Sequence, residues 1–527
     1  MNLVRRIGVE FLKVVSVRRA MADLRFPVAA VLTALMACVS AGASVGSAGT
    51  LNQPNILLLV SEDSGAELGC YGTPDVRTPR LDQLAAEGSQ FSNAYVPNPV
   101  CSASRAAFLT GLYPFQNGQI GLATHRYAMY QAWQNIPAVL RLAGYRTGLI
   151  GKLHVNPESA FPFDFRWNEA KSNSFNARNV RRVAEVAGDF FQESEQPFFL
   201  ALNFSDAHFP LLRQQFGLPQ NPLRGQDVSG TLPFIGVDTP RLRQGTADYY
   251  NCLMRLDSGI GMVLDELQAA GKANQTLVIF IGDHGAQFSR GKATCYEGGL
   301  KIPMLIRWPG KTVAGEVRDE LVSTVDILPT VREACGIAPD PSLPGRSLLP
   351  LAAGQQVQWR QYLFAERTAY HSGSFYPQRT LRDRRYKIIL NLLAGQPNPV
   401  AEIYCTLQTG FFEYGTHSEE VMSASPLVRQ AYETWRKPPR VELYDLQTDP
   451  WEFQNLSAES AFSEPLQRLQ TELQRFREQY HDPLLDPDKL QQLAEEHRVV
   501  AEELPRGRYS AGQQWRYPQY LQNRAEP

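Results

Sequence analysis

The run Ile56-Leu57-Leu58-Leu59-Val60, followed at once by Ser61-Glu62-Asp63, is the most informative stretch of this chain for its architecture. Consecutive apolar residues without alternation are typical of a strand buried on both faces, as in a parallel sheet covered by helices. The carboxylates of Glu62 and Asp63 would then stand just beyond the strand's carboxyl end, where open α/β sheets bind ligands. We therefore expect a functional loop directly after this strand.

Three further apolar runs repeat this arrangement. We predict buried strands over residues 147–150, 198–204 and 277–281. Polar residues follow each of them in turn: Lys152 and His154, then Asp206 and His208, then Asp283 and His284. Because parallel strands end at the same edge of a sheet, these side chains should converge with those of the first loop on one site.

Helix signals separate the apolar runs. Thr78 followed by Pro79, with Gly88 behind them, is typical of a helix with an N-cap, a proline at its first position and a C-terminal glycine. A longer helix is predicted over residues 248–267. The alternation of strand and helix across residues 55–310 predicts an α/β fold with a large, mixed but mostly parallel sheet between helices.

The rest of the chain divides into segments of different character. Residues 1–50 place basic residues before a short apolar stretch, which is the order of an export signal, and run into a linker. Residues 51–354 form the predicted catalytic domain, residues 355–482 a smaller antiparallel subdomain with a helix, and residues 483–527 a polar tail that wraps or is loosely ordered. We expect an exported protein that is periplasmic, extracellular or, less readily, anchored as a lipoprotein through Cys38.

Composition narrows the function. A chain of 527 residues with 43% apolar residues and a formal net charge of -1 is typical of a globular protein and not of a nucleic-acid binder. An anionic substrate must therefore be met by local charge. The seven cysteines include no C-x-x-C pair. Five of them are expected as packing residues: Cys70, Cys252, Cys295, Cys335 and Cys405.

The stretch Cys101-Ser102-Ala103-Ser104-Arg105 is the most specific motif of the chain. It precedes a helix-like run, so Cys101 should lie near a helix N-terminus, where anions are favoured. With Leu109-Thr110-Gly111 behind it, the motif resembles the formylglycine signature of type I sulfatases, within the alkaline phosphatase superfamily. Ala103 stands where that signature most often has proline. Among sulfatases, the run 117–122 is similar to sulfamidases and related glycosaminoglycan sulfatases.

The resemblance implies a calcium site and a modified cysteine. The ligands that it implies are Glu62, Asp63, Asp283 and His284, together with Cys101 after a formylglycine-generating enzyme has converted it to formylglycine. Carboxylate oxygens suit a hard cation such as Ca²⁺, whereas imidazole is a softer ligand. Glu62 stands where the family more often has aspartate.

The resemblance also implies a mechanism, in which one hydroxyl of the hydrated aldehyde attacks sulfur and the second later expels sulfate. The cations that would compensate charge on the sulfuryl oxygens are Arg105, Lys152 and Lys292. His154 would assist the second hydroxyl and His208 would protonate the leaving group, with these two roles open to exchange. Asp206 and Arg379 are expected to bind substrate. The remaining histidines are expected in solvated loops or on the surface: His125, His371, His417, His481 and His497.

Three functions stay open. The first is hydrolysis of the sulfate esters of a sulfated saccharide, with cleavage of N-sulfamates as a variant. The second is a phosphonate or phosphodiester hydrolase of the same superfamily, because sulfate and phosphate esters share a tetrahedral geometry. The third is a non-catalytic protein that binds sulfated glycans, although the intact motifs count against it.

Overall fold

The computed structural model describes residues 53–168, 178–407, 410–504, 509 and 512–522. These residues belong to a unit that spans Gln53–Pro527. The predicted export signal and linker, with Cys38, lie outside the described residues. Within the described residues, no helix combines the length and the apolar character that a membrane crossing requires.

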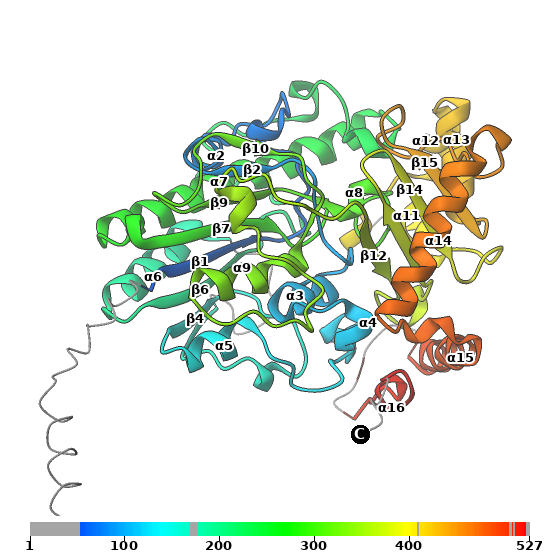
Figure 1. Cartoon of the computed structure of the whole chain (residues 1–527). Coiled ribbons are helices and arrows are strands. Elements are labelled where there is room, and N and C mark those ends of the chain that lie inside the picture. The colour runs from blue at the N-terminus through cyan, green and yellow to red at the C-terminus, as the bar shows by residue number, and fades with distance from the viewer. Residues whose placement is uncertain (1–52, 169–177, 408–409, 505–508, 510–511, 523–527) are drawn as a thin grey trace, which may run out of the picture. The chain divides into compact units, whose positions relative to one another are not determined.

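An eight-stranded sheet forms the centre of this unit (Figure 1), with the strand order β10-β2-β9-β7-β1-β6-β4-β5. Its strands are β1 (Asn55–Ser61), β2 (Ser89–Phe91), β4 (Arg146–Ile150), β5 (Phe165–Trp167), β6 (Phe198–Phe204), β7 (Thr276–Gly282), β9 (Met304–Arg307) and β10 (Glu316–Arg318). All neighbouring strands are parallel except where β9 pairs with β2 and with β7. The prediction of a mixed, mostly parallel sheet is confirmed.

The four predicted strands correspond to β1, β4, β6 and β7. In β1, β6 and β7 every residue is buried, as expected for strands covered on both faces. Strand β1 pairs in parallel with β6 on one side and with β7 on the other, so that Leu58 lies between Ala201 and Ile279. The loops that follow these three strands therefore leave the same edge of the sheet side by side.

Helices cover the sheet in two groups. In one group α7 (Pro240–Ala269) contacts both α2 (Pro79–Glu87) and α6 (Val180–Gln192). In the other α9 (Ile327–Ala334) contacts both α3 (Cys101–Thr110) and α5 (Ile136–Leu142). Helix α2 has the predicted bounds, with Thr78 at its N-cap and Gly88 at its C-cap. Helix α7 begins at Pro240 and not at Asp248, because the Thr239 side chain caps it by accepting the Leu242 N–H.

Short elements complete the catalytic part of the chain. A three-stranded sheet joins β11 (Val322–Ser323), β3 (Ala94–Tyr95) and β8 (Lys301–Ile302). The short helices are α4 (Pro114–Asn117), α8 (Glu297–Leu300) and α10 (Leu349–Ala352). These elements connect the main sheet to the C-terminal part of the chain.

The C-terminal part contains a four-stranded antiparallel sheet, with α14 (Ser463–Gln479) packed on β13 and β14 (Figure 1). Its strands, in order across the sheet, are β12 (Leu363–Arg367), β13 (Gln378–Arg382), β14 (Tyr386–Asn391) and β15 (Val441–Asp445). The strand-like segment 380–390 is a hairpin, because the polar turn at residues 383–385 interrupts it. The residues described between β14 and β15 include the α-helices α11 (Pro399–Thr406), α12 (Ser418–Ser423) and α13 (Pro426–Arg436).

The segment beyond residue 483 packs against the rest of the unit where it is described. It contains α15 (Pro487–Glu503) and α16 (Tyr517–Tyr520), whose apolar side chains join a cluster with Ile120 and Tyr127. His497 is 1% exposed, which corrects its expected place on the surface. Its ring accepts a hydrogen bond from the Tyr127 hydroxyl at 2.8 Å, because its Nδ1–H donates to the Leu493 carbonyl. The sequence around His497 is polar, so its pattern did not predict that this side chain is buried.

Candidate active site

Cys101 is the first residue of α3, as its motif predicted. The preceding Val100 is extended and its carbonyl accepts the Ser104 N–H at 2.9 Å, which starts the helix at this position. Cys101 is 1% exposed, and its thiol lies 3.1 Å from His284 Nε2 and 3.9 Å from Asp63 Oδ1. A negatively charged group at residue 101 is stabilised by the first turn of the helix.

Two carboxylates and an imidazole surround this thiol. One side-chain ligand atom each from Asp63, Cys101 and His284 lies within 4.8 Å of the other two. Asp283 borders the group, since its Oδ1 accepts the Asp63 N–H at 2.9 Å and lies 3.7 Å from His284 Nε2. The loops after β1 and β7 thus meet at the N-terminus of α3, as the strand-end rule predicted.

The charges of this group favour a bound cation. Burial by itself would lower the pKa of His284, but Asp283, Cys101 and Asp63 outweigh it and raise that pKa to about 9. The His284 Nδ1–H donates to the Gly285 carbonyl at 2.9 Å, which leaves Nε2 as the atom that faces Asp63 and Cys101. Buried carboxylate oxygens beside an oriented imidazole nitrogen fit a divalent cation, and oxygen ligands suit calcium.

Arg105 links three strand-end loops. Its Nε and Nη2 contact Asp283 Oδ2 at 3.1 and 3.0 Å, and Nη2 also lies 3.3 Å from Glu62 Oε1. Its Nη1 donates to Asn203 Oδ1 at 2.7 Å and to the Lys152 carbonyl at 3.0 Å. This fully buried guanidinium therefore fixes both carboxylates in place.

The Glu62 carboxylate is paired with two cationic side chains. Besides Arg105, its carboxylate accepts from Lys152 Nζ at 3.2 Å, so each of its two oxygens has a cationic partner. Glu62 is not part of the compact group formed by Asp63, Cys101 and His284. Its place among the metal ligands remains a prediction.

Lys292 lies against the same group from the loop after β7. Its Nζ donates to both oxygens of Asp63, at 2.9 and 2.8 Å, and to Gln287 Oε1 at 3.2 Å. Burial would lower the pKa of Lys292, yet Asp63 and Cys101 raise it well above the usual value, so the ammonium stays charged. Conversely, burial raises the pKa of Cys101, and Lys292, Lys152 and His284 overcome this and lower it.

The two histidines expected to move protons are both neutral near pH 7. Burial is the main cause that lowers the pKa of His154 and of His208 well below the usual value, and Lys152 and Lys292 lower both further. The His208 Nδ1–H donates to the Phe209 carbonyl at 2.7 Å, so Nε2 is the nitrogen that can gain or lose a proton. His154 Nε2 lies 3.5 Å from Thr124 Oγ1.

Backbone geometry at the site is unusual for residues with side chains. Asp63 and His154 have φ values of 50° and 59°, a left-handed conformation that the surrounding packing must hold. Gly151, at φ 85°, precedes Lys152, and a Cβ there would lie 2.5 Å from the Asn203 carbonyl oxygen. Glycine is therefore required where this loop crosses β6.

The two residues expected to bind substrate have other partners. Arg379 is fully buried and bound to Asp482, through Nε at 2.8 Å and Nη2 at 2.9 Å, and to Glu366 at 3.1 Å. It holds β13 to the end of α14, and this corrects the expectation. Asp206 is 2% exposed and accepts from Arg255 Nε at 2.5 Å, which assigns its carboxylate a structural partner as well.

Sequence reasoning missed several polar residues around the site. Asn203 and Gln287 hold Arg105 and Lys292, and Thr124 contacts His154. The only signal for Asn203 is a polar residue inside an otherwise apolar strand. His125 and His371 are half-buried with ring centroids 5.5 Å apart, and burial lowers the pKa of each to about 4. They are thus less exposed than expected.

A buried cysteine at a helix N-terminus, ringed by carboxylates, lysines and an arginine at the carboxyl edge of a parallel sheet, is a site for displacement at a tetrahedral oxyanion. Residues 54–337 match the family model described as sulfatase, and residues 282–398 match the model of the C-terminal region of N-sulphoglucosamine sulphohydrolase. The chain belongs to the sulfatase family, and its enzyme class is sulfuric ester hydrolase.

Relatives of known name agree with this assignment. The chain is similar to human N-sulphoglucosamine sulphohydrolase, with 32% identity over 463 residues, or 81% of this chain and 91% of the relative. A protein solved in complex with its substrate D-glucosamine-2-N,6-O-disulfate has a TM-score of 0.59 and 18% identity, over 82% of this chain and 98% of that one. The phosphonate monoester hydrolase of Agrobacterium radiobacter has a TM-score of 0.60 and 19% identity, over 81% and 96%. At these identities the two structures establish the fold alone.

Proposed function

We propose that this sulfatase cleaves the N-sulfate of glucosamine in a sulfated saccharide. The observation that carries the choice of substrate is the match of residues 282–398 to the C-terminal model of N-sulphoglucosamine sulphohydrolase. The human enzyme of that name is also similar along 91% of its own length, so the likeness includes the regions outside the shared catalytic centre. Hydrolysis of an O-sulfate on such a sugar is the alternative within the same site.

We propose further that Cys101 is converted to formylglycine and that Ca²⁺ is bound by Glu62, Asp63, Asp283, His284 and the modified residue. The hydrated aldehyde would supply the nucleophile, and the cation would stabilise charge on the sulfuryl oxygens. The position of residue 101 at the start of α3, within 3.9 Å of a carboxylate oxygen, supports this arrangement. So does the raised pKa of His284, which reports an excess of negative charge beside Nε2.

The chain's own residues would then divide the work. Arg105, Lys152 and Lys292 carry positive charge beside the position of the sulfuryl group and compensate its oxygens. His208 must first take up a proton at Nε2, because its Nδ1–H is held by the Phe209 carbonyl, and would then donate that proton to the leaving nitrogen. His154 would accept a proton during release of sulfate. Because both rings are neutral near pH 7, we expect His208 to be a better acid as the pH falls.

Peptide mass spectrometry over residue 101, on protein coexpressed with a formylglycine-generating enzyme, tests the modification. We expect the thiol to be replaced by an aldehyde or its hydrate, and Cys101→Ala to abolish turnover. Cys335→Ala is the matched control, because this half-buried cysteine lies outside the site and should leave turnover unchanged. An unmodified thiol in fully active protein would contradict the proposal.

A substrate panel separates the candidate reactions. We expect turnover of N-sulfoglucosamine and of its 6-O-sulfated form, dependent on Ca²⁺ and lost on chelation. Release of O-sulfate alone would replace the sulfamidase assignment by that of a sugar O-sulfatase. Faster turnover of an aryl phosphonate than of every sulfated sugar would favour the phosphonate hydrolase.

We also propose that the protein is exported through a signal within residues 1–50. The amino end of the secreted protein, determined by Edman sequencing, should then lie in the small-residue stretch that follows the apolar run. Retention of the full N-terminus in the cell would contradict export.

A further inference from the structure

A hollow lies where the C-terminal antiparallel sheet adjoins the segments of β3 and β8. It has a volume of about 480 Å³ and is formed by the turn between β13 and β14, the segment after β15, and the start of β8. Four cations line it: Lys301, Arg382, Arg384 and Arg385. The residues described for this lining include none of the candidate active-site residues.

The hollow has an excess of positive charge at its surface. Glu297 is the one acidic residue among the described lining residues, and its two oxygens are bound by Arg382 at 2.8 Å and by Lys387 at 3.0 Å. Burial would raise the pKa of Glu297, but Arg382 and Lys387 hold it at about 2. This carboxylate is therefore engaged within the protein and does not repel an incoming anion.

The cations differ in how far they are already neutralised. Arg384 pairs with Asp319 through both Nη atoms at 3.0 Å, and Arg385 pairs with Asp445 at 2.7 Å. The side chains of Arg384 and Arg385 are nevertheless 63% and 50% exposed, which leaves further N–H groups facing solvent. The Arg384–Asp319 pair is exposed on both sides, so it is weak and can exchange for a ligand anion. Asp445 is only 4% exposed, so Arg385 keeps this partner and offers its remaining N–H groups.

Lys301 differs from the other three cations because no described residue forms a direct ion pair with it, and Glu297 and Glu67 act on it only over a longer distance. Among the described residues, no hydrogen bond or ion pair engages its ammonium, although it is half-buried on β8. Burial lowers its pKa, and Glu297 only partly offsets this effect. An anion bound beside Lys301 would remove the cost of this partly desolvated charge.

Trp451 adds an apolar surface to the same hollow. It is half-buried and follows β15, where it packs near Phe234 with ring centroids 6.0 Å apart. A sulfated pyranose has both an apolar ring face and anionic groups, and the pair of an indole with guanidinium groups matches both. We propose that this hollow binds a sulfated segment of a saccharide, apart from the unit that is hydrolysed. This proposal rests on the proposed function only in taking a sulfated saccharide as the ligand.

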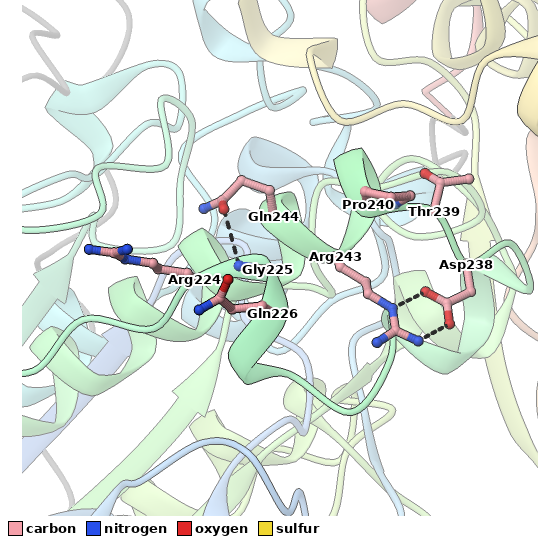
Figure 2. Close-up of a pocket in the computed structure, with 8 residues that line it drawn as sticks. All are labelled: Arg224, Gly225, Gln226, Asp238, Thr239, Pro240, Arg243 and Gln244. Atoms are coloured by element: carbon pink, nitrogen blue, oxygen red, sulfur yellow. Dashed lines mark hydrogen bonds and ion pairs between the residues drawn. The ribbon is translucent and has the colours of Figure 1, made fainter.

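A hollow at the start of α7 provides the contrast (Figure 2). It has a volume of about 610 Å³ and is lined by Arg224, Asp238 and Arg243, among others. Figure 2 shows Arg243 closed on Asp238, at 2.6 and 2.5 Å, while Arg224 points away from this pair. It has an unneutralised arginine but no aromatic ring among its described lining residues, so it serves as the control surface.

The test measures binding of a heparin octasaccharide by calorimetry at two salt concentrations. The variant Lys301→Gln with Arg384→Gln should weaken binding about tenfold, because the two lost charge-assisted contacts together contribute at this level. Turnover of monosaccharide N-sulfoglucosamine should be unchanged in the same variant, since neither residue touches the active site. The control Arg224→Gln should leave both measurements unchanged.

Two further ligands test whether the hollow recognises the sulfate charges, the sugar rings or both. Desulfated octasaccharide and inorganic sulfate should bind at least about tenfold more weakly than the sulfated octasaccharide, because they lack the charges or the ring surface. Unaltered octasaccharide affinity in the double variant, or an equal loss in Arg224→Gln, would overturn the proposal. If the double variant does not fold, Arg384→Gln alone gives the answer, because its side chain is exposed.

Failure of the proposed function would look different. In that case the wild-type protein would not turn over N-sulfoglucosamine either. The double variant would still bind the octasaccharide more weakly than Arg224→Gln does.

Discussion

Arg105 shows how much a single side chain contributes to the active site. It is completely buried and contacts two carboxylates, a carbonyl and an amide oxygen from four different segments of the chain. The carboxylates it binds, Glu62 and Asp283, are themselves inaccessible to water. Burying charges in this way is tolerable only while each has its partner.

Replacing Arg105 by alanine should therefore harm both stability and catalysis. We expect the free energy of unfolding to fall by about 3–5 kcal/mol, because two buried carboxylates each lose one cationic partner. Arg105→Lys should restore part of the stability but not the activity, since an ammonium cannot reproduce the fork of N–H groups. Urea unfolding and turnover of N-sulfoglucosamine measure the two effects.

Arg475→Ala is the control for this prediction. Its partner Glu472 lies one turn away on α14 and the Arg475 side chain is 68% exposed, so the change should be below about 0.5 kcal/mol. An unfolding midpoint for Arg105→Ala as high as that of Arg475→Ala would show that the buried pairs add nothing.

At the scale of elements, Trp515, which precedes α16, supports the loop that carries Thr124. Trp515 is 7% exposed, stacks on Tyr127 with centroids 4.4 Å apart, and donates its Nε1–H to the His125 carbonyl at 2.9 Å. Thr124, next to His125, contacts His154 of the site. The end of the chain is thus joined to a catalytic loop through a short series of contacts.

Trp515→Ala should loosen this connection. We expect a loss of about 3–5 kcal/mol in the free energy of unfolding from the cavity left behind, and a higher KM because the loop at Thr124 loses its support. Leu142→Ala is the matched control, since that side chain is 90% exposed and should change neither quantity. Denaturant unfolding and steady-state kinetics measure both. A raised KM in Leu142→Ala, or an unchanged KM in Trp515→Ala, would show that Trp515 does not support the active-site loop.

The whole molecule is expected to lose stability in mild acid because it buries neutral histidines. Burial is the main cause that lowers the pKa of His497 to about 3, and those of His125 and His371 to about 4. The unfolded chain takes up these protons as the pH falls below about 6.5, whereas the folded chain does not. The stability contributed by the neutral rings is complete above that pH and declines as the pH falls toward 4.

His497→Gln tests this account. Between pH 7.5 and pH 5 the wild-type chain should lose about 2 kcal/mol more of its unfolding free energy than the variant does, because one buried group no longer titrates. Leu142→Ala should keep the wild-type pH dependence, because that side chain is 90% exposed and has no ionisable group. Urea unfolding at the two pH values gives the comparison. Parallel pH profiles for His497→Gln and the wild type would exclude His497 as a source of the acid sensitivity.

Much of the architecture follows from local sequence patterns. Uninterrupted apolar runs predicted β1, β4, β6 and β7, because strands buried on both faces need no polar alternation. Proline and glycine at its ends predicted α2. The motif predicted that Cys101 lies near a helix N-terminus, and α3 begins at this residue, so that the motif itself is helical. The polar residues at the strand ends could be grouped into one site because parallel strands finish at one edge.

What the tertiary structure alone decided is how each charge is used. Arg379 reads as a candidate substrate contact in the sequence, yet its side chain meets Asp482 from a segment far along the chain and is buried. His497 is polar and lies on a polar helix, but α15 turns it against Tyr127. Ion pairing and burial depend on residues that folding brings together from distant segments. A local pattern of neighbouring residues cannot predict which distant residues will meet.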